Sequence, residues 1–282
     1  ELADYLEPFH LEGMRFKWRR WIIFDCNWKV ALEAFNETYH VEFTHPEFMR
    51  FGQFSGWGKQ HGKHSQTGYG SAKDSNNAKI RLGAGDPRTS TAEMQQYTWD
   101  HTAGTTTTCT LVQAAQRLAK ELPEGTPGPK VLEHWIASAK RDDAARGVVW
   151  PVVDPDHYQK AGNAWQVFPN FQIGHALNNA LCYRAKPYGF DPNKCHFEMM
   201  VLELFPKDGE PASEWEFTPY PDPRWLSVLP QDFSNMQAVQ EGMKSMGFMG
   251  PRPNPWQERA VSALHSTLSK YMGTGAPHPV KK

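Results

Sequence analysis

The pattern of hydrophobic and polar positions divides the chain into a strand-rich middle and helices toward its end. Residues 14–25 (MRFKWRRWIIFD) are rich in aromatic and β-branched side chains and predict a strand. The segment 195–206 (CHFEMMVLELFP) predicts a strand most clearly. Strands are also predicted at 148–154, 165–174 and 180–189.

Helical spacing is clearest in residues 28–40, which follow Asn27, a suitable N-cap. Pro46 is compatible with an end of this helix at or before Thr44–His45. Segment 105–122 is ambiguous, because TTTTCTLV favours a strand and AAQRLAKEL a helix. Segment 52–88 is rich in Gly, Ser, Lys, His and Gln and predicts loops and exposed hairpins. Helices are predicted at 129–147, 232–247 and 254–272.

These elements predict one α+β domain over residues 1–282. No internal repeat and no second core separated by a linker is apparent. Residues 1–13 are interpreted as an entry segment, and residues 274–282 as a mobile tail.

Composition narrows the function classes. The 30 Lys and Arg nearly balance the 31 Asp and Glu, so nothing favours nucleic acid or anionic lipid as a partner. No apolar run approaches the roughly 18–20 residues of a membrane helix, and no signal-peptide pattern opens the chain. The four cysteines are scattered without a CxxC pair and predict reduced thiols in a cytoplasmic protein.

The segment that carries chemistry contains Glu37, His40 and His45 in an E-x2-H-x4-H pattern. Imidazole is a common ligand for iron, zinc and copper, and two histidines with one carboxylate form the facial triad of non-haem Fe(II) oxygenases. Glu37 and His40 share a helix face, whereas His40 and His45 are about 140° apart on an ideal helix. The helix must therefore loosen or end between the two histidines if both bind one ion.

Simpler interpretations exist for each of these residues. The pattern also fits a helix end with two partly exposed histidines, and Glu37 fits a helix surface. His61 and His64 form a rival metal pair, but they stand in a Gly-, Lys- and Gln-rich stretch with no acid nearby and are interpreted as solvated loop residues.

The run NWKVALEAFNETYHVEFTHP (27–46) resembles the iron-site signature in the catalytic domain of Rieske-type ring-hydroxylating oxygenase α subunits. The segment 165–170 (WQVFPN) resembles the FPN-type strand of that family, and 231–242 resembles the segment that supplies its carboxylate ligand. The resemblance covers nearly the whole chain. It is dense in 27–46 and 228–245 and thin across 52–160.

The resemblance implies that His40, His45 and Asp232 are ligands of one Fe(II) ion, with Asp154 and Asp156 as alternative carboxylates. Asp232 also fits an ordinary helix N-cap. Glu37 matches a carboxylate that links the iron site to a [2Fe–2S] cluster in a neighbouring subunit. Ring dioxygenases of the family usually carry Asp there, so monohydroxylation and oxidative demethylation stand beside cis-dihydroxylation as expected reactions.

One departure concerns the electron-delivering domain, which binds its Rieske cluster through C-x-H and C-x2-H motifs. Neither motif occurs around Cys26, Cys109, Cys182 or Cys195. The chain therefore resembles the catalytic domain alone, with residues 1–13 as the connection from a Rieske domain that was removed, lost or lies on another chain. Electrons are expected from such a domain, a ferredoxin or a reductase, and indirectly from NAD(P)H. Family members commonly form homotrimers.

The resemblance also implies a helix-grip fold, a curved antiparallel sheet around a long C-terminal helix that encloses a cavity. An apolar, aromatic small molecule and O2 are the expected substrates. A metal-free helix-grip binding domain and a zinc hydrolase are the rival functions. The candidate pocket residues are Asn36, Phe43, Phe48, Met49, Phe51, Phe168, Asn170 and His175.

Overall fold

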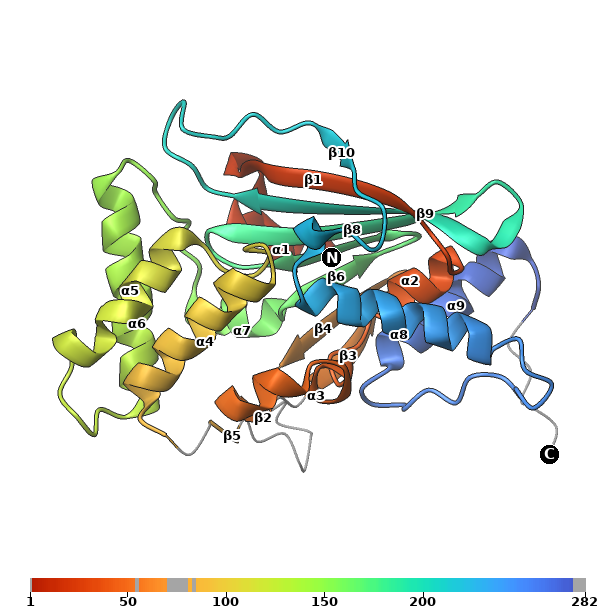
Figure 1. Cartoon of the computed structure of the whole chain (residues 1–282), viewed down its shortest axis with the longest axis horizontal. Coiled ribbons are helices and arrows are strands. Elements are labelled where there is room, and N and C mark those ends of the chain that lie inside the picture. The colour runs from red at the N-terminus through yellow and green to blue at the C-terminus, as the bar shows by residue number, and fades with distance from the viewer. Residues whose placement is uncertain (1, 54–55, 70–80, 83–84, 276–282) are drawn as a thin grey trace.

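A mostly antiparallel sheet of eight strands forms the centre of the fold (Figure 1). The computed structural model describes residues 2–53, 56–69, 81–82 and 85–275. The strand order is β10-β1-β9-β8-β7-β6-β4-β3, and only the β1–β10 pairing is parallel. The strands are β1 Arg15–Phe24, β3 Gly56–His61, β4 His64–Tyr69, β6 Ala164–Val167, β7 Phe171–His175, β8 Asn179–Tyr188, β9 Asp191–Glu203 and β10 Trp215–Phe217; β2 Gly52–Gln53 and β5 Arg81–Leu82 pair separately.

The helices gather in two groups at opposite ends of the sheet (Figure 1). One group contains α2 Trp28–Glu33, α8 Val228–Gly242 and α9 Arg259–Met272, and the other contains α4 Pro87–His101, α5 Cys109–Glu121 and α6 Gly128–Ala145. The remaining helices are short: α1 Leu2–Leu6, η1 Glu7–Phe9, η2 Leu11–Gly13, α3 His40–Thr44, η3 Pro46–Phe51, α7 Pro155–Ala161 and η4 Pro223–Trp225.

The main core is aromatic and joins the sheet to α2, α8 and α9. Phe197 of β9 is fully buried and lies among Phe24, Phe35, Tyr183 and Phe233, with ring centroids 5.8–6.5 Å away. Aromatic pairs at such spacing add to the free energy gained by burying their area. This core fixes α8 against the sheet.

Side chains alternate across the sheet, so the central strand β8 contributes to two cores. Leu181 and Tyr183 of β8 face the main core, whereas Cys182 packs with Ile173 in a second core on the opposite face. That second core also receives Leu2 from α1. The alternation follows from the two-residue period of a strand.

Most of the strands and helices predicted from the sequence are confirmed. Strands 14–25, 180–189 and 195–206 correspond to β1, β8 and β9, and helices 129–147, 232–247 and 254–272 to α6, α8 and α9. Segment 165–174 is two strands, β6 and β7, because a turn occupies 168–170. Together these elements give the α+β, helix-grip-like fold that was expected.

Two predictions of secondary structure are wrong, those for 148–154 and 28–40, and the ambiguous segment 105–122 is helical from Cys109. Residues 148–154 form no strand: Val148 and Trp150 are buried in a small core with α5 and α6, and Trp150 Nε1 donates to Asp143 Oδ2 at 2.6 Å. Residues 105–108 are irregular, and Thr108 caps α5. The expected helix 28–40 ends at Glu33. Helix α4 was not predicted, because its sequence is polar and weakly periodic.

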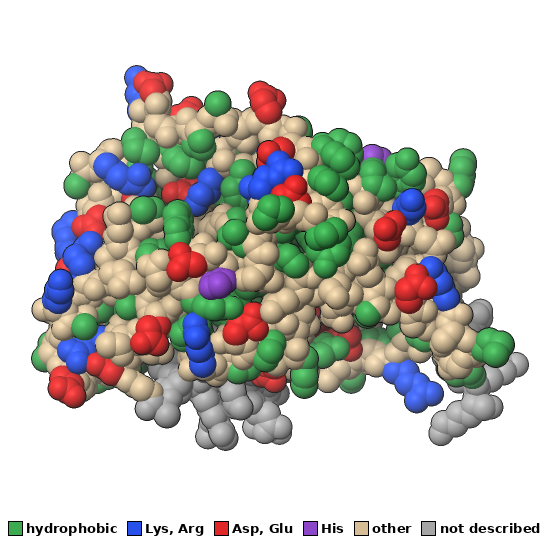
Figure 2. Space-filling model, viewed as in Figure 1, with side chains coloured by type: hydrophobic (Ala, Val, Ile, Leu, Met, Phe, Trp, Pro, Cys, Tyr) green, Lys and Arg blue, Asp and Glu red, His purple; other side chains and the backbone are tan. Residues whose placement is uncertain are grey.

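Two surface properties complete the description. None of the helices in the described ranges is both long and apolar enough to pass through a bilayer. On the face shown in Figure 2, basic and acidic side chains are interspersed, and neither kind gathers into a patch. The expected mobile tail, 274–282, lies outside the described residues from 276 onward.

The aromatic core gives a stability prediction with a matched control. Phe197→Ala removes a fully buried ring and should lower the free energy of unfolding by about 3–5 kcal/mol. Phe190→Ala removes a fully exposed ring from the turn between β8 and β9. This change should alter the free energy of unfolding by less than about 0.5 kcal/mol. Urea unfolding followed by tryptophan fluorescence compares the two. Equal midpoints for both variants would contradict this description of the core.

Candidate metal centre

The chain leaves helical geometry between α2 and α3, and this break directs the first histidine. Asn27 caps α2 by accepting a hydrogen bond from the Lys29 amide at 3.0 Å, and α2 ends at Glu33. Residues 34–39 form turns, after which His40 begins α3. The predicted shared helix face of Glu37 and His40 is therefore wrong, because Glu37 lies in no helix.

Glu37 nevertheless contacts His40 through its carboxylate. Oε2 accepts the His40 backbone N–H at 2.9 Å, which satisfies a free amide at the start of α3. Oε1 lies 2.6 Å from His40 Nδ1. Helix α3 ends at Thr44, so the expected end before His45 is confirmed. His45 thus leaves the helix and can approach the same point as His40.

Asp232 reaches this point from α8. It is the fifth residue of that helix, whose N-cap is Ser227, so the alternative of Asp232 as an N-cap is wrong. Its Oδ1 lies 3.0 Å from His45 Nε2 and 3.7 Å from His40 Nε2. One donor atom from each of the three residues falls within 4.8 Å of the others. His45 and Asp232 are buried, and His40 is half-buried.

Hydrogen bonds on the opposite ring edges fix the tautomers of both histidines. His40 Nδ1 faces the Glu37 carboxylate, and His45 Nδ1 lies 2.7 Å from Gln231 Oε1. A carboxylate and an amide oxygen only accept, so both Nδ1 atoms carry hydrogen, and Nε2 is the atom through which each ring can bind a metal. This arrangement is typical of metal-ligating histidines.

Gln231 is held in turn by Glu47, because its Nε2 donates to Glu47 Oε1 at 2.8 Å. Burial raises the pKa of Glu47, but hydrogen bonds from its own backbone, Gln231 and Tyr97 outweigh burial and lower it. The carboxylate is therefore ionised. It orients the Gln231 carbonyl toward His45.

The centre attracts positive charge. Burial lowers the pKa of His40, but the hydrogen bond and charge of Glu37, with Asp232, outweigh it, so the net pKa is raised. Burial likewise lowers the pKa of His45, and Asp232 and Gln231 raise it beyond the ordinary value. The same oxygens that favour imidazolium favour a metal cation at this point.

The three groups lie on the wall of an internal cavity of about 550 Å³ between α3, α4, α8 and strands β7 and β8. Phe35, Phe48, Leu181, Tyr183 and Leu229 provide apolar surface. Polar surface comes from Gln172, Asn179 and threonines in and just after the last turn of α4. Sequence reasoning missed Leu181 and Tyr183, although their alternation along β8 could have indicated them.

A second hollow lies on the outer side of the same centre. This outer groove, of about 910 Å³, is lined by α2, α3 and α8 and includes Tyr39, Phe43 and Val239. Glu37 and His40 line both the groove and the internal cavity. These two side chains therefore form the partition between them.

The candidate pocket residues fall in different places. Phe48 and His175 line the internal cavity, and Phe43 is 76% exposed in the outer groove. Asn36 is fully buried and accepts a hydrogen bond from Gln172. The remaining four candidates are not among the described residues that line the internal cavity: Met49, Phe51, Phe168 and Asn170. Phe51 packs beside Phe48, and Phe168 packs against Tyr271. Asn170 donates a hydrogen bond to the Ala185 carbonyl.

The alternative ligands are engaged elsewhere. His61 and His64 face each other across the β3–β4 hairpin, where His61 contacts Gln66 and His64 accepts the Phe168 N–H. Asp154 caps α7. Within the described ranges, only His40, His45 and Asp232 form a group suited to a metal.

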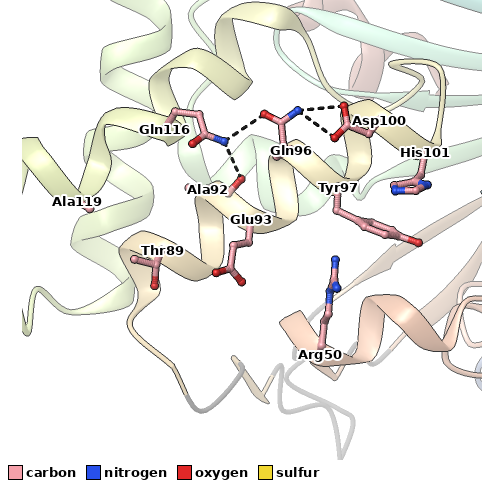
Figure 3. Close-up of a pocket in the computed structure, with 10 residues that line it drawn as sticks. All are labelled: Arg50, Thr89, Ala92, Glu93, Gln96, Tyr97, Asp100, His101, Gln116 and Ala119. Carbon is pink, nitrogen blue, oxygen red and sulfur yellow. Dashed lines mark hydrogen bonds between the residues drawn. The ribbon is translucent and has the colours of Figure 1, made fainter.

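A third cavity, also of about 550 Å³, lies between α4, α5 and Arg50 (Figure 3). Tyr97 stacks on His101 at 4.2 Å, and the Arg50 guanidinium lies 4.6 Å from the Tyr97 ring centroid. Gln96 donates to Asp100 and accepts from Gln116. Tyr97 also hydrogen-bonds Glu47, so this cavity adjoins the chain of contacts that ends at His45.

Comparison with known proteins gives a family. Residues 4–274 match the family described as the catalytic domain of the ring hydroxylating alpha subunit. Structures of the quaternary ammonium Rieske monooxygenase CntA, with L-carnitine and with γ-butyrobetaine, are similar at 12% and 13% identity and TM-scores of 0.47 and 0.46. Each alignment covers 95% of this chain. This chain spans about half of the length of the CntA chains, 55% and 54%. No curated protein matches. Because the family match spans nearly the whole sequence, this chain belongs to the ring-hydroxylating α subunits and corresponds to their catalytic domain.

Proposed function

We propose that this chain is the oxygen-activating domain of a Rieske-type oxygenase, which hydroxylates an apolar, aromatic small molecule at a mononuclear non-haem Fe(II). The observation that carries the proposal is the convergence of His40, His45 and Asp232 on one wall of an internal cavity. Family membership supplies the reaction class.

The residues present fit such an ion. Two neutral imidazoles and a carboxylate are the donor set of the facial triad, which leaves positions free for further ligands. Both histidines direct Nε2 toward Asp232, and both Nδ1 atoms are held by acceptors. Bound Fe(II) would supply the activation of O2, with electrons from outside the chain.

The protein's own residues would hold the geometry and shield the reaction. Glu37 and Gln231 keep the imidazole rings in place, and Asp232 balances charge. Phe35, Phe48 and Tyr183 would pack against the substrate and exclude water. Monohydroxylation, cis-dihydroxylation and oxidative demethylation are all compatible with this arrangement.

Electrons would arrive from the outer groove. Glu37 reaches both this groove and His40 Nδ1, so it can couple a docked redox centre to a metal ligand. The docked centre would be a Rieske [2Fe–2S] cluster on another domain or subunit of a homotrimer, reduced by a ferredoxin or reductase from NAD(P)H. The exposed Phe43 and Val239 offer apolar contact for it.

The proposal predicts an open iron site that depends on His40. After anaerobic reconstitution with Fe(II), nitric oxide should give the high-spin iron–nitrosyl EPR signal. His40→Ala and Asp232→Asn should lose most of the signal, because each removes one of three ligands. His61→Ala and His64→Ala are matched controls that should leave it unchanged.

The other results would redirect the assignment. Iron uptake that depends on His61 and His64 would place the metal in the β3–β4 hairpin. Failure to bind iron, with retained binding of small aromatic molecules, would favour the metal-free binding domain. Retention of zinc in place of iron, with oxygen-independent activity, would favour the hydrolase.

The relay behind His45 gives a second prediction. Gln231→Leu removes the acceptor that fixes His45 and should weaken Fe(II) binding by about 10–100-fold. Gln237→Leu, the same change on the same helix away from the cavity, should have little effect. Competition with a fluorescent chelator measures both. Identical dissociation constants would mean that Gln231 does not position the ligand.

A further inference from the structure

The charges that line the internal cavity restrict its ligand. Among the described lining residues, none is Lys or Arg. The acids are Glu37 and Asp232, and both are engaged with the histidines. A charged group placed away from the metal centre would therefore find no side-chain counter-ion among these residues, and burying it would cost several kcal/mol.

The cavity is long and has two different ends. Leu181 and Tyr183 face it from β8, and Asn179 continues the same row. Tyr183 lies toward the metal end, since its ring stacks at 4.0 Å on Phe35, two residues before Glu37. Asn179 is four residues away along an extended strand, or about 13 Å. Asn179 therefore lies at the end remote from the metal.

The remote end offers hydrogen-bond acceptors that lack a donor. Asn179 is 4% exposed, and its Oδ1 has no partner among the described residues, while its Nδ2 faces the Thr105 carbonyl at 3.5 Å. The hydroxyls of Thr98 and Thr102 donate to the helix carbonyls of Met94 and Thr98, so only their lone pairs remain. A buried acceptor without a donor is costly, and a ligand that supplies a donor would remove that cost.

His175 adds to this end. It pairs with Ala180 beside Asn179, and its buried ring has a backbone contact at Ala161 and no hydrogen bond to a side chain of the described chain. Burial lowers the pKa of His175 to about 4, so the ring is neutral at physiological pH. The remote end is thus polar but uncharged.

We propose that the substrate is an elongated, uncharged molecule whose apolar body packs along Leu181 and Tyr183 and whose hydroxyl group donates to Asn179 Oδ1. A carboxylate or quaternary ammonium group at the remote end is disfavoured, because no charged side chain lies there among the described lining residues. The inference rests on the proposed function, because it assigns the opposite end of the substrate to the metal centre. Asn179 is accordingly a residue that determines specificity.

A matched set of ligands tests the proposal on the Fe(II)-loaded chain. The probes are biphenyl, 4-hydroxybiphenyl, biphenyl-4-carboxylate and a 4-trimethylammonio biphenyl, compared by anaerobic calorimetric titration. The hydroxylated probe should bind about tenfold more tightly than biphenyl, as expected for one added buried hydrogen bond. Both charged probes should bind more weakly than biphenyl.

Substitutions then assign the preference to one side chain. Asn179→Leu should abolish the tenfold preference while biphenyl still binds, which also shows that the variant is folded. Asn179→Ser, which keeps a hydrogen-bonding group, should retain part of the preference. Asn193→Leu, on β9 outside the cavity, is the matched control and should behave as the unchanged chain.

Equal binding of biphenyl and 4-hydroxybiphenyl, a preference that survives Asn179→Leu, tighter binding of a charged probe, or no binding of either neutral probe would each overturn the inference. The iron–nitrosyl signal separates this result from failure of the proposed function. A normal signal without the preference rejects the substrate class alone. The preference without any iron signal rejects the oxygenase and leaves the assignment of Asn179 intact.

Discussion

The approach of His45 Nε2 to Asp232 Oδ1, at 3.0 Å, is the contact on which the site depends. It joins His45, which follows α3 in the first part of the chain, to α8 in the last part, and neither segment supplies the centre alone. The packing of α8 sets the direction of Asp232. Phe233, next in sequence, is fully buried among Phe24 and Trp225 with ring centroids 5.1–5.2 Å away. The aromatic core therefore determines where the carboxylate points.

The two histidines are supported differently. His40 is held directly by a carboxylate, whereas His45 is held by an amide that a more distant carboxylate orients. A direct carboxylate raises the basicity of an imidazole more than an amide does. The two ligands would thus bind an ion with unequal strength. The stronger donor is the one beside the outer groove.

Local sequence was enough for some of this structure and not for the rest. The strands β8 and β9 follow from their two-residue period, and the histidine pair from its spacing. Asp232 has no local pattern and was found only through the family resemblance, because its role depends on a distant helix. Phe43 lies in the outer groove and Phe48 lines the internal cavity. Helical periodicity could not predict this difference, because the chain is not helical over residues 34–39.

The errors share a physical cause. Val148 and Trp150 have the side chains of a strand, but a neighbouring helix pair buries them without a partner strand. Helix α4 has few apolar positions, since its residues line two cavities rather than a core. In both cases tertiary packing, which a single sequence does not display, decided the outcome.

The partition formed by Glu37 and His40 separates the internal cavity from the outer groove. Under the proposed function, small molecules would occupy the internal cavity, and an electron donor would approach from the outer groove. The shape of the inner chamber can therefore diverge through substitutions at β7, β8 and α4 without altering the surface that a donor must recognise. Under the proposed function, the His40 imidazole lies between a cavity whose lining can vary and a groove whose surface must fit the electron donor.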